Sequence, residues 1–266
     1  MNQLHYPKPG KAMMAARRAA FDTPNRPQDF DHELFRSQEI FVASSDLHGE
    51  RRSLLVNRIV DNLSTGPEGR GIGYCLLRGF SYFMSIEETR AASIVLLNAA
   101  WKRFRSRSPR ISPSRDFRIL ESITHDGAIP TELFGSRWSF KPPHADCNSV
   151  LFAHVYGPTL GFDGGDVLLI DALAYAASRN LDFGDVCQWS SDAGDKKPVL
   201  RAAHVQPALD GYGRRLGRLG PDEMLFVNNG CDGVFHGASE VVVRDDNDFV
   251  RVLHRCVAME RGSEAS

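Results

Sequence analysis

The fold is decided around Lys141-Pro-Pro-His-Ala-Asp-Cys147, a segment that lies among short strand patterns. It places His144 and Asp146 one residue apart. On an extended backbone, residues i and i+2 point to the same side, so this imidazole and this carboxylate share one face. The spacing therefore predicts two ligands of a metal site, on a stretch that Pro142 and Pro143 make rigid.

A second histidine follows far along the chain, at Phe235-His236-Gly237, after the turn residues Gly230 and Gly233. A single His-x-Asp pair is weak evidence in a chain with nine histidines. Two histidines and one carboxylate together fill three positions of an octahedral metal and leave three open, a donor set typical of non-haem Fe(II) oxygenases. The predicted metal ligands are therefore His144, Asp146 and His236.

The last strand pattern, Phe249–Ala258, alternates so that Phe249, Arg251, Leu253 and Arg255 face one side. Two arginines directed from one strand into a barrel interior would be costly unless they met anions. The planar guanidinium matches a carboxylate through two parallel hydrogen bonds. The pattern therefore predicts an anion site beside the metal.

Short strands separated by turns dominate the chain from Phe117 onward. They do not alternate with helices as in βαβ units, and Ala172–Ser178 is a short helical interruption. This texture predicts a fold that is mainly β with flanking helices, built on an antiparallel barrel or jelly roll. The predicted strands are Phe117–Ile123, Asn148–Tyr156, Val167–Ile170, Leu200–Val205, Met224–Val227, Val241–Val243 and Phe249–Ala258.

The N-terminal part has a different character. Residues 1–70 are predicted to form an arm and helices that pack on the core, with helix-like apolar spacing over Leu54–Leu63. His48-Gly-Glu50 also matches a His-x-acid pattern, but it has no strand context and is interpreted as a surface loop or helix cap. The glycines of Gly66–Gly73 precede a strand, Tyr74–Phe80, which is the reverse of the order in a phosphate-binding loop.

A helix is predicted to begin at Ser85, an N-cap with Glu87 in the first turn, as an insert near 85–105 in a domain of residues 71–260. The basic, Ser/Pro-rich segment Lys102–Arg115 follows and is interpreted as a solvated loop. The alternative is that this loop grips a phosphate, a carboxylate or a nucleic-acid strand. Residues 261–266 are predicted to be a disordered tail.

Composition argues against several classes of protein. The net charge is −1, so no overall field attracts DNA, RNA or an anionic membrane. The five cysteines are odd in number and scattered, which favours reduced thiols over a disulfide frame or a zinc site. The chain lacks an apolar run that could span a bilayer and the apolar core of a signal peptide, so a cytoplasmic location is expected.

The chain from about Tyr74 to Met259 resembles the taurine dioxygenase-like branch of the Fe(II)/2-oxoglutarate-dependent oxygenases. The matching elements, in order, are Leu76-Leu-Arg-Gly-Phe80, Trp138 before His144-Ala-Asp146, Gly164-Gly-Asp-Val167, and His236 followed by Arg251-Val-Leu-His-Arg255. Each is unspecific alone, but their order and separation are characteristic. The resemblance implies a double-stranded β-helix (jelly-roll) core. It also implies that Fe(II), 2-oxoglutarate and O2 hydroxylate an unactivated C–H bond of a small, anionic or amino-acid-like molecule, releasing succinate and CO2.

The resemblance also implies roles for individual residues. His144, Asp146 and His236 would bind iron. Arg251 would clamp the distal carboxylate of 2-oxoglutarate, and Arg255 would reach the anionic end of the substrate, although which arginine holds which anion is left open. Further substrate contacts are expected from Asn148, Tyr156 and Asn229.

One residue departs from the family pattern. Related proteins often have threonine after Gly-Gly-Asp, where its hydroxyl bonds the carboxylate of the cosubstrate, but Val167 has no hydroxyl. We expect Asn148, Asn228 or Trp138 to replace that hydrogen bond, or cosubstrate binding to be weaker.

Other functions remain compatible with the same residues. Desaturation and ring closure share this metal site with hydroxylation. A nucleic-acid demethylase would use the Lys102–Arg115 loop to follow phosphates. A metal-free, cupin-like binding module would use the histidines structurally. The identity of the substrate and the oligomeric state are not readable from the sequence.

Overall fold

The computed structural model describes residues 38–65, 71–107, 117–125, 141–146, 149–192, 195–230, 233–239, 241–244 and 250–260. Before residue 141 its elements are β1 (Glu39–Phe41), the 3-10 helix η1 (Ser44–Leu47), α3 (Gly49–Leu63), β2 (Tyr74–Arg78), the 3-10 helix η2 (Phe80–Tyr82), α4 (Ile86–Arg107) and β3 (Phe117–His125). After it come β4 (Lys141–His144), β5 (Ser149–Leu160), β6 (Phe162–Gly164), β7 (Val167–Ile170), α6 (Ala172–Ser178), α7 (Phe183–Val186), β8 (Cys187–Asp192), β9 (Asp195–Leu200), α8 (Ala202–Tyr212), β10 (Gly213–Arg215), β11 (Glu223–Asn228), β12 (Phe235–Ala238), β13 (Val241–Val243) and β14 (Val250–Glu260).

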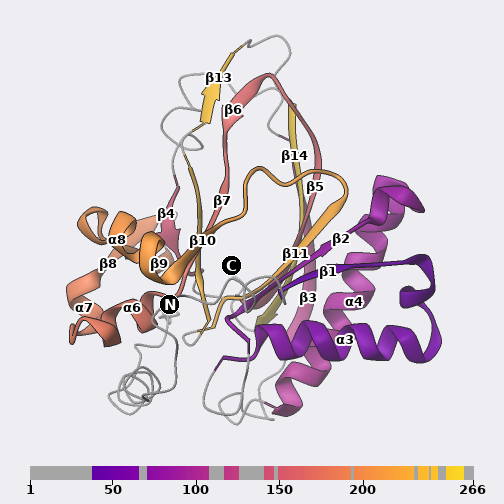
Figure 1. The fold of residues 1–266 in the computed structure, drawn as a ribbon, viewed down its shortest axis with the longest axis horizontal. Coiled ribbons are helices and arrows are strands. Elements are labelled where there is room, and N and C mark those ends of the chain that lie inside the picture. The colour runs from indigo at the N-terminus through magenta and orange to yellow at the C-terminus, as the bar shows by residue number, and fades with distance from the viewer. Residues whose placement is uncertain are drawn as a thin grey trace.

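Two six-stranded sheets face each other (Figure 1). The first sheet has the strand order β1-β2-β11-β5-β14-β3, and the second has the order β10-β7-β12-β4-β9-β8. Apart from the parallel β1–β2 pair, the neighbouring strands in both sheets are antiparallel. Apolar side chains from β2, β5, β7, β11 and β14 form one buried cluster between the sheets.

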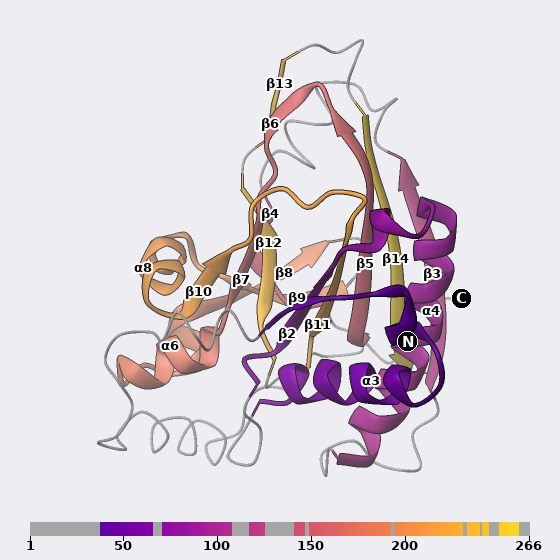
Figure 2. The ribbon, with the colours of Figure 1, turned by 45° about the vertical axis from the view of Figure 1, so that its right-hand side comes forward.

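Helices α3 and α4 cover the outer face of the first sheet (Figure 2). Alternation along β11 explains why this sheet is buried on both sides. Phe226 packs with the helices, whereas Leu225 and Val227 pack between the sheets. The same alternation on β14 sends Cys256 toward the helices and Val257 toward the interior.

Helices α6, α7 and α8 make a second apolar cluster with the second sheet. Ala145 and Phe235 belong to this cluster and are 1% and 3% exposed. Because strand neighbours point to opposite faces, burying Phe235 there turns His236 toward the first sheet. In the same way, because Ala145 packs in this outer cluster, its neighbour His144 points toward the first sheet.

The structure confirms most predicted elements and corrects three. Val167–Ile170, Val241–Val243 and the helix Ala172–Ser178 have the predicted bounds. The predicted strand Leu200–Val205 is wrong, because β9 ends at Leu200 and the following residues form α8, where Val205 packs in the apolar cluster.

The other two corrections concern the N-terminal half. The predicted strand Tyr74–Phe80 ends at Arg78, since Gly79 has a left-handed φ of 100° and begins a 3-10 turn. The start of the predicted loop Lys102–Arg115 is helical, because α4 continues to Arg107 and buries Phe104. The rest of this loop, most of the N-terminal arm and the tail 261–266 lie outside the described residues.

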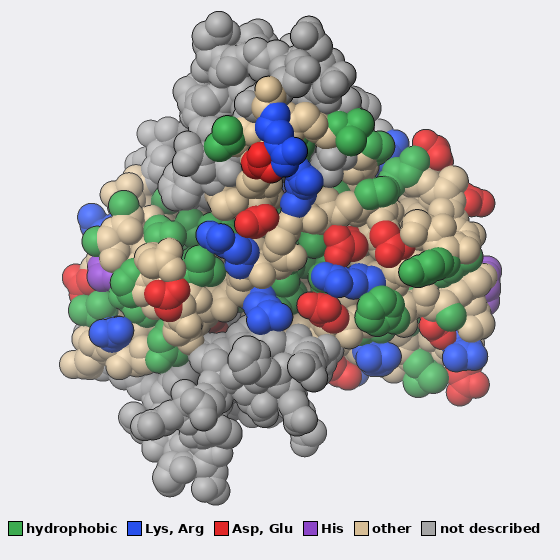
Figure 3. All heavy atoms as spheres, turned by 45° about the horizontal axis from the view of Figure 1, so that its top comes forward, with side chains coloured by type: hydrophobic (Ala, Val, Ile, Leu, Met, Phe, Trp, Pro, Cys, Tyr) green, Lys and Arg blue, Asp and Glu red, His purple; other side chains and the backbone are tan. Residues whose placement is uncertain are grey.

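The surface is mixed in charge. Figure 3 shows basic and acidic side chains interspersed on one face. Ion pairs on the described part of the chain include Arg215 with Asp166 and Arg244 with Asp163. None of the described helices is both long and apolar enough to cross a membrane.

Candidate metal centre

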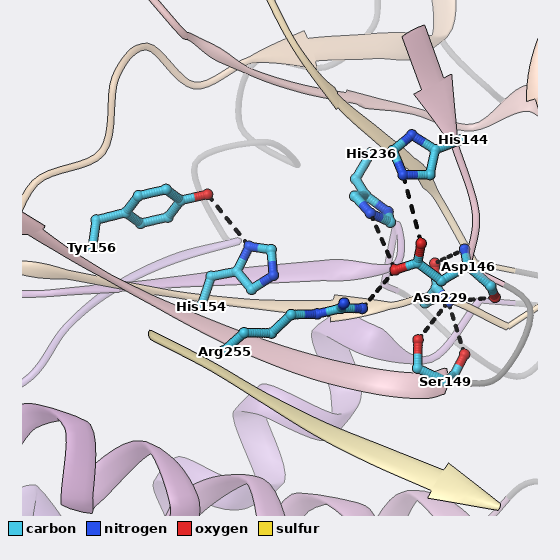
Figure 4. Close-up of polar contacts among 8 residues, drawn as sticks. All are labelled: His144, Asp146, Ser149, His154, Tyr156, Asn229, His236 and Arg255. Atoms are coloured by element: carbon cyan, nitrogen blue, oxygen red, sulfur yellow. Dashed lines mark hydrogen bonds and ion pairs between the residues drawn. The ribbon is translucent and has the colours of Figure 1, made fainter. Parts of the chain in front are cut away.

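The two predicted histidine ligands lie on neighbouring strands. β4 and β12 are antiparallel, and His144 stands directly opposite His236 in their register. Directly opposed residues point to the same face, and the two ring centroids are 4.5 Å apart. Asp146 follows the end of β4 and points into the same space (Figure 4). The structure therefore brings together the three residues that the sequence predicts as ligands.

The ligand atoms are spaced as in a preformed site. His144 Nε2 is 3.6 Å from Asp146 Oδ1, and His236 Nε2 is 3.6 Å from Asp146 Oδ2. One ligand atom from each of the three residues lies within 4.8 Å of the others. Ligands that bind one metal at about 2.0–2.2 Å lie roughly 3 Å apart when they are neighbours, so only a small closure is needed.

The protonation states also suit a metal. Burial, reinforced by electrostatic repulsion from the neighbouring imidazole of His144, lowers the pKa of His236 well below its usual value, so the His236 imidazole is neutral at physiological pH. Burial acts to raise the pKa of Asp146, but Arg255 and the two histidines outweigh it and hold that pKa well below its usual value. A metal ligand must be a neutral imidazole or an ionised carboxylate, and His236 and Asp146 meet this requirement.

Asn229 holds the backbone of the Asp146 segment. It follows β11, is 0% exposed, and its Oδ1 accepts a hydrogen bond from Asp146 N at 3.1 Å. Its Nδ2 donates to Asp146 O at 2.9 Å and to Ser149 O at 2.8 Å. Asn229 was expected to contact substrate. Because its amide is instead occupied by this segment, we propose a positioning role for it.

We expect Asn229→Ala to weaken both the fold and the metal site. The loss leaves buried backbone groups of Asp146 and Ser149 unpaired, at a cost of about 2–4 kcal/mol in the free energy of unfolding. Metal affinity should fall by about 10–100-fold, as for other residues that orient a ligand. Urea unfolding and calorimetric titration with Mn(II) measure the two effects.

Asn228→Ala is the matched control. Its side chain is also buried, but its Nδ2 donates to Leu63 O at the end of α3 and its Oδ1 accepts a hydrogen bond from Gly230 N, so neither bond involves a ligand residue. It should lose similar stability and keep its metal affinity. Equal metal affinities in both variants would contradict the positioning role of Asn229.

Arg255 extends from β14 of the first sheet to the carboxylate of Asp146. Its Nη2 donates to Asp146 Oδ2 at 2.5 Å, and its guanidinium lies 5.3 Å from the ring centroid of Phe152 (Figure 4). Its Nε is buried and has no hydrogen-bond partner among the described residues. The predicted contact with a substrate anion stays a prediction, because the partner that the structure gives to Arg255 is Asp146.

The remaining predicted site residues divide into three groups. Tyr156 and Val167 line the cavity around the metal ligands, and the Tyr156 hydroxyl is 3.4 Å from His154 Nδ1. Arg251 is described only as backbone, paired with Thr159 on β5. Trp138, Asn148 and Phe249 lie outside the described residues.

A strand irregularity separates the two arginines of β14. Arg251 pairs with Thr159, whereas Leu253 pairs with Tyr156, so Gly157 and Pro158 of β5 stand against a single residue. A bulge suits proline, which lacks the N–H that a ladder requires. Of the side chains predicted to share one face, Leu253 and Arg255 both line the cavity.

The cavity also contains residues that the sequence did not single out. Its volume is about 160 Å³, which suits a small molecule, and its lining includes Phe152, His154 and Lys197. Phe152 stacks on His154 with centroids 4.4 Å apart and meets His236 edge-on at 4.8 Å. Alternation along the predicted strand of Tyr156 could have identified Phe152 and His154. Lys197 was missed because β9 was not predicted.

Comparison with protein-family models finds no match, and neither does comparison with curated proteins. Among solved structures, asparagine oxygenase in complex with Fe(II), 2S,3S-3-hydroxyasparagine and succinate matches 84% of this chain and 93% of its own, with 12% identity and a TM-score of 0.44. The non-heme iron oxygenase OrfP, in complex with (3S)-hydroxy-L-Arg, matches 94% of this chain and 92% of its own, with 10% identity and a TM-score of 0.42.

A BsmA homologue from Methylobium petroleophilum matches 68% of this chain with 14% identity and a TM-score of 0.37, and the match spans 56% of that protein's length. Similarities of this size assign no function. The proposal below therefore rests on the residues of this chain.

Proposed function

We propose that the protein is an Fe(II)- and 2-oxoglutarate-dependent oxygenase that hydroxylates a small, anionic or amino-acid-like molecule. The observation that carries the proposal is the convergence of His144, Asp146 and His236, with ligand atoms within 4.8 Å of one another. This donor set leaves three metal positions open, which is the requirement for binding a chelating cosubstrate and O2 together.

The path of the chain supports a double-stranded β-helix core. From β4 to β14 the chain passes repeatedly between the two large sheets. The strands β4, β7 to β10 and β12 belong to the second sheet, and β5, β11 and β14 belong to the first. Such alternation between two facing sheets is the arrangement of a jelly roll. The metal ligands lie on its second sheet and the arginines on its first.

Each group of residues has a proposed task. Bound Fe(II) and 2-oxoglutarate would supply the O2-dependent oxidation, with succinate and CO2 as coproducts. His144, Asp146 and His236 hold the metal, and Arg251 holds the distal carboxylate of the cosubstrate. Val167, Leu225 and Leu253 give the cavity apolar walls, which exclude water from the reacting groups.

Anaerobic addition of Fe(II) and 2-oxoglutarate tests the proposal. We expect the weak visible charge-transfer band of a metal-bound 2-oxo acid, and succinate formation once O2 is admitted. His236→Ala should show neither, since it removes a ligand. A protein that binds Fe(II) without the band would contradict the proposal. A protein that binds no Fe(II) would also contradict it and would favour the metal-free, cupin-like binding module.

The product identifies the outcome of the reaction. Hydroxylation adds one oxygen atom to the substrate, whereas desaturation and ring closure remove two hydrogens, so mass spectrometry distinguishes them. A nucleic-acid substrate is disfavoured by the net charge of −1, since binding along phosphates draws on an excess of basic side chains.

A further inference from the structure

Lys197 lines the same cavity as His144, Asp146 and His236, from β9, the strand beside β4. In the β4–β9 register, His144 stands directly opposite Val199. Lys197 is two residues from Val199 on the same strand, so it shares the face of His144, about 7 Å along the strand. Its side chain is partly buried and lines the cavity. The ammonium group is therefore within the length of a small molecule from the metal ligands.

Three charged side chains of the described residues line the cavity. They are Lys197, Arg255 and Asp146. Arg255 Nη2 lies 2.5 Å from Asp146 Oδ2, and a bound metal would be coordinated by the same carboxylate. An ammonium group on the wall of a cavity favours an anionic ligand over a neutral one.

The two cations lie on opposite walls. Arg255 belongs to β14 of the first sheet, which also carries the arginine proposed for 2-oxoglutarate. Lys197 belongs to β9 of the second sheet. On the wall of the first sheet, His154 and Tyr156 of β5 also present aromatic rings to the cavity. An anion at Lys197 is thus held apart from the site proposed for the distal carboxylate of the cosubstrate.

We propose that Lys197 is a specificity-determining residue that binds a carboxylate or sulfonate of the primary substrate. The proposal rests on the function proposed above. A lysine ammonium is a compact charge on a flexible four-carbon stem, so it suits an anionic group without imposing the planar geometry of a guanidinium. The remainder of the substrate would lie against the aromatic side chains of β5.

Thermal unfolding of the full chain, loaded with Mn(II) and N-oxalylglycine, tests this proposal. The probes are the amino acids, their N-acetyl derivatives and taurine, each paired with the neutral analogue in which an amide replaces the acid. We expect stabilisation by one or more anionic probes and not by their neutral partners. Lys197→Met should raise the half-saturating concentration of those probes by about 10–100-fold, and Lys197→Arg should restore most of the affinity.

Lys102→Met is the control, because Lys102 is exposed on α4. It should bind the probes like the unmodified chain. Equal binding by Lys197→Met, equal stabilisation by the neutral partners, or no stabilisation by any anionic probe would overturn the proposal.

The charge-transfer band shows whether a negative result contradicts only the role of Lys197 or also the proposed oxygenase function. We expect Lys197→Met to form the band with Fe(II) and 2-oxoglutarate at the same cosubstrate concentration as the unmodified chain. If the unmodified chain forms no band, the oxygenase proposal fails. If the band forms and Lys197→Met still binds the probes, only the role of Lys197 fails.

Discussion

Asp146→Ala is expected to abolish metal binding and succinate formation together. The substitution removes one of three ligands, and loss of a residue that merely orients a ligand already costs about 10–100-fold in affinity, so the decrease should exceed about 100-fold. Metal at 100 times its dissociation constant stabilises a protein by about 2.7 kcal/mol. Addition of Mn(II) should therefore raise the melting temperature of the unmodified chain but leave that of Asp146→Ala unchanged.

Asp61→Ala provides a matched control. Asp61 pairs with Arg107 at 2.5 Å, the same distance as Asp146 with Arg255, but it is exposed on α3. An exposed ion pair contributes little to stability, so this variant should retain metal binding and turnover. Metal-dependent stabilisation that persists in Asp146→Ala would show that the carboxylate is not a ligand.

Arg251→Ala is expected to raise the dissociation constant of 2-oxoglutarate by about 100-fold or more. A bidentate arginine–carboxylate contact makes two charge-assisted hydrogen bonds, each of which contributes about 1.5–3 kcal/mol. Metal binding should be unchanged, because the ligand atoms of His144, Asp146 and His236 are untouched. Titration of the charge-transfer band gives the cosubstrate affinity, and calorimetry gives the metal affinity.

Arg255→Met should instead destabilise the metal-free protein and leave the affinity for 2-oxoglutarate nearly unchanged. It leaves the Asp146 carboxylate, which is 24% exposed, without its cation, so the metal-free protein should lose about 1–3 kcal/mol of stability. A bound divalent metal also compensates that charge, so the loss should shrink when metal is saturating. The affinity for 2-oxoglutarate should change less than about 10-fold. If Arg255→Met lost the cosubstrate and Arg251→Ala kept it, the two roles would be exchanged.

Local patterns were sufficient to identify the candidate metal ligands, which the structure brings together. The His144/Asp146 spacing and the strand start at His236 depend only on chain neighbours, and apolar Ala145 and Phe235 fix which way those strands face. The same local alternation predicted β7, β13 and most of β14. It failed at Leu200–Val205, where Ala202 begins a helix whose apolar side chains meet the second sheet, because the pattern there is short enough to suit either structure.

The sequence by itself determined the donor set, the mainly β class of the fold and the presence of arginines on the last strand. Only the tertiary structure decided that Asn229 holds the ligand segment, that Arg255 bonds Asp146, and that Lys197 enters the cavity beside His144. The reason is physical. The side on which a residue lies follows from the two-residue period of its own strand, whereas its partner depends on the register between strands that lie far apart in the chain.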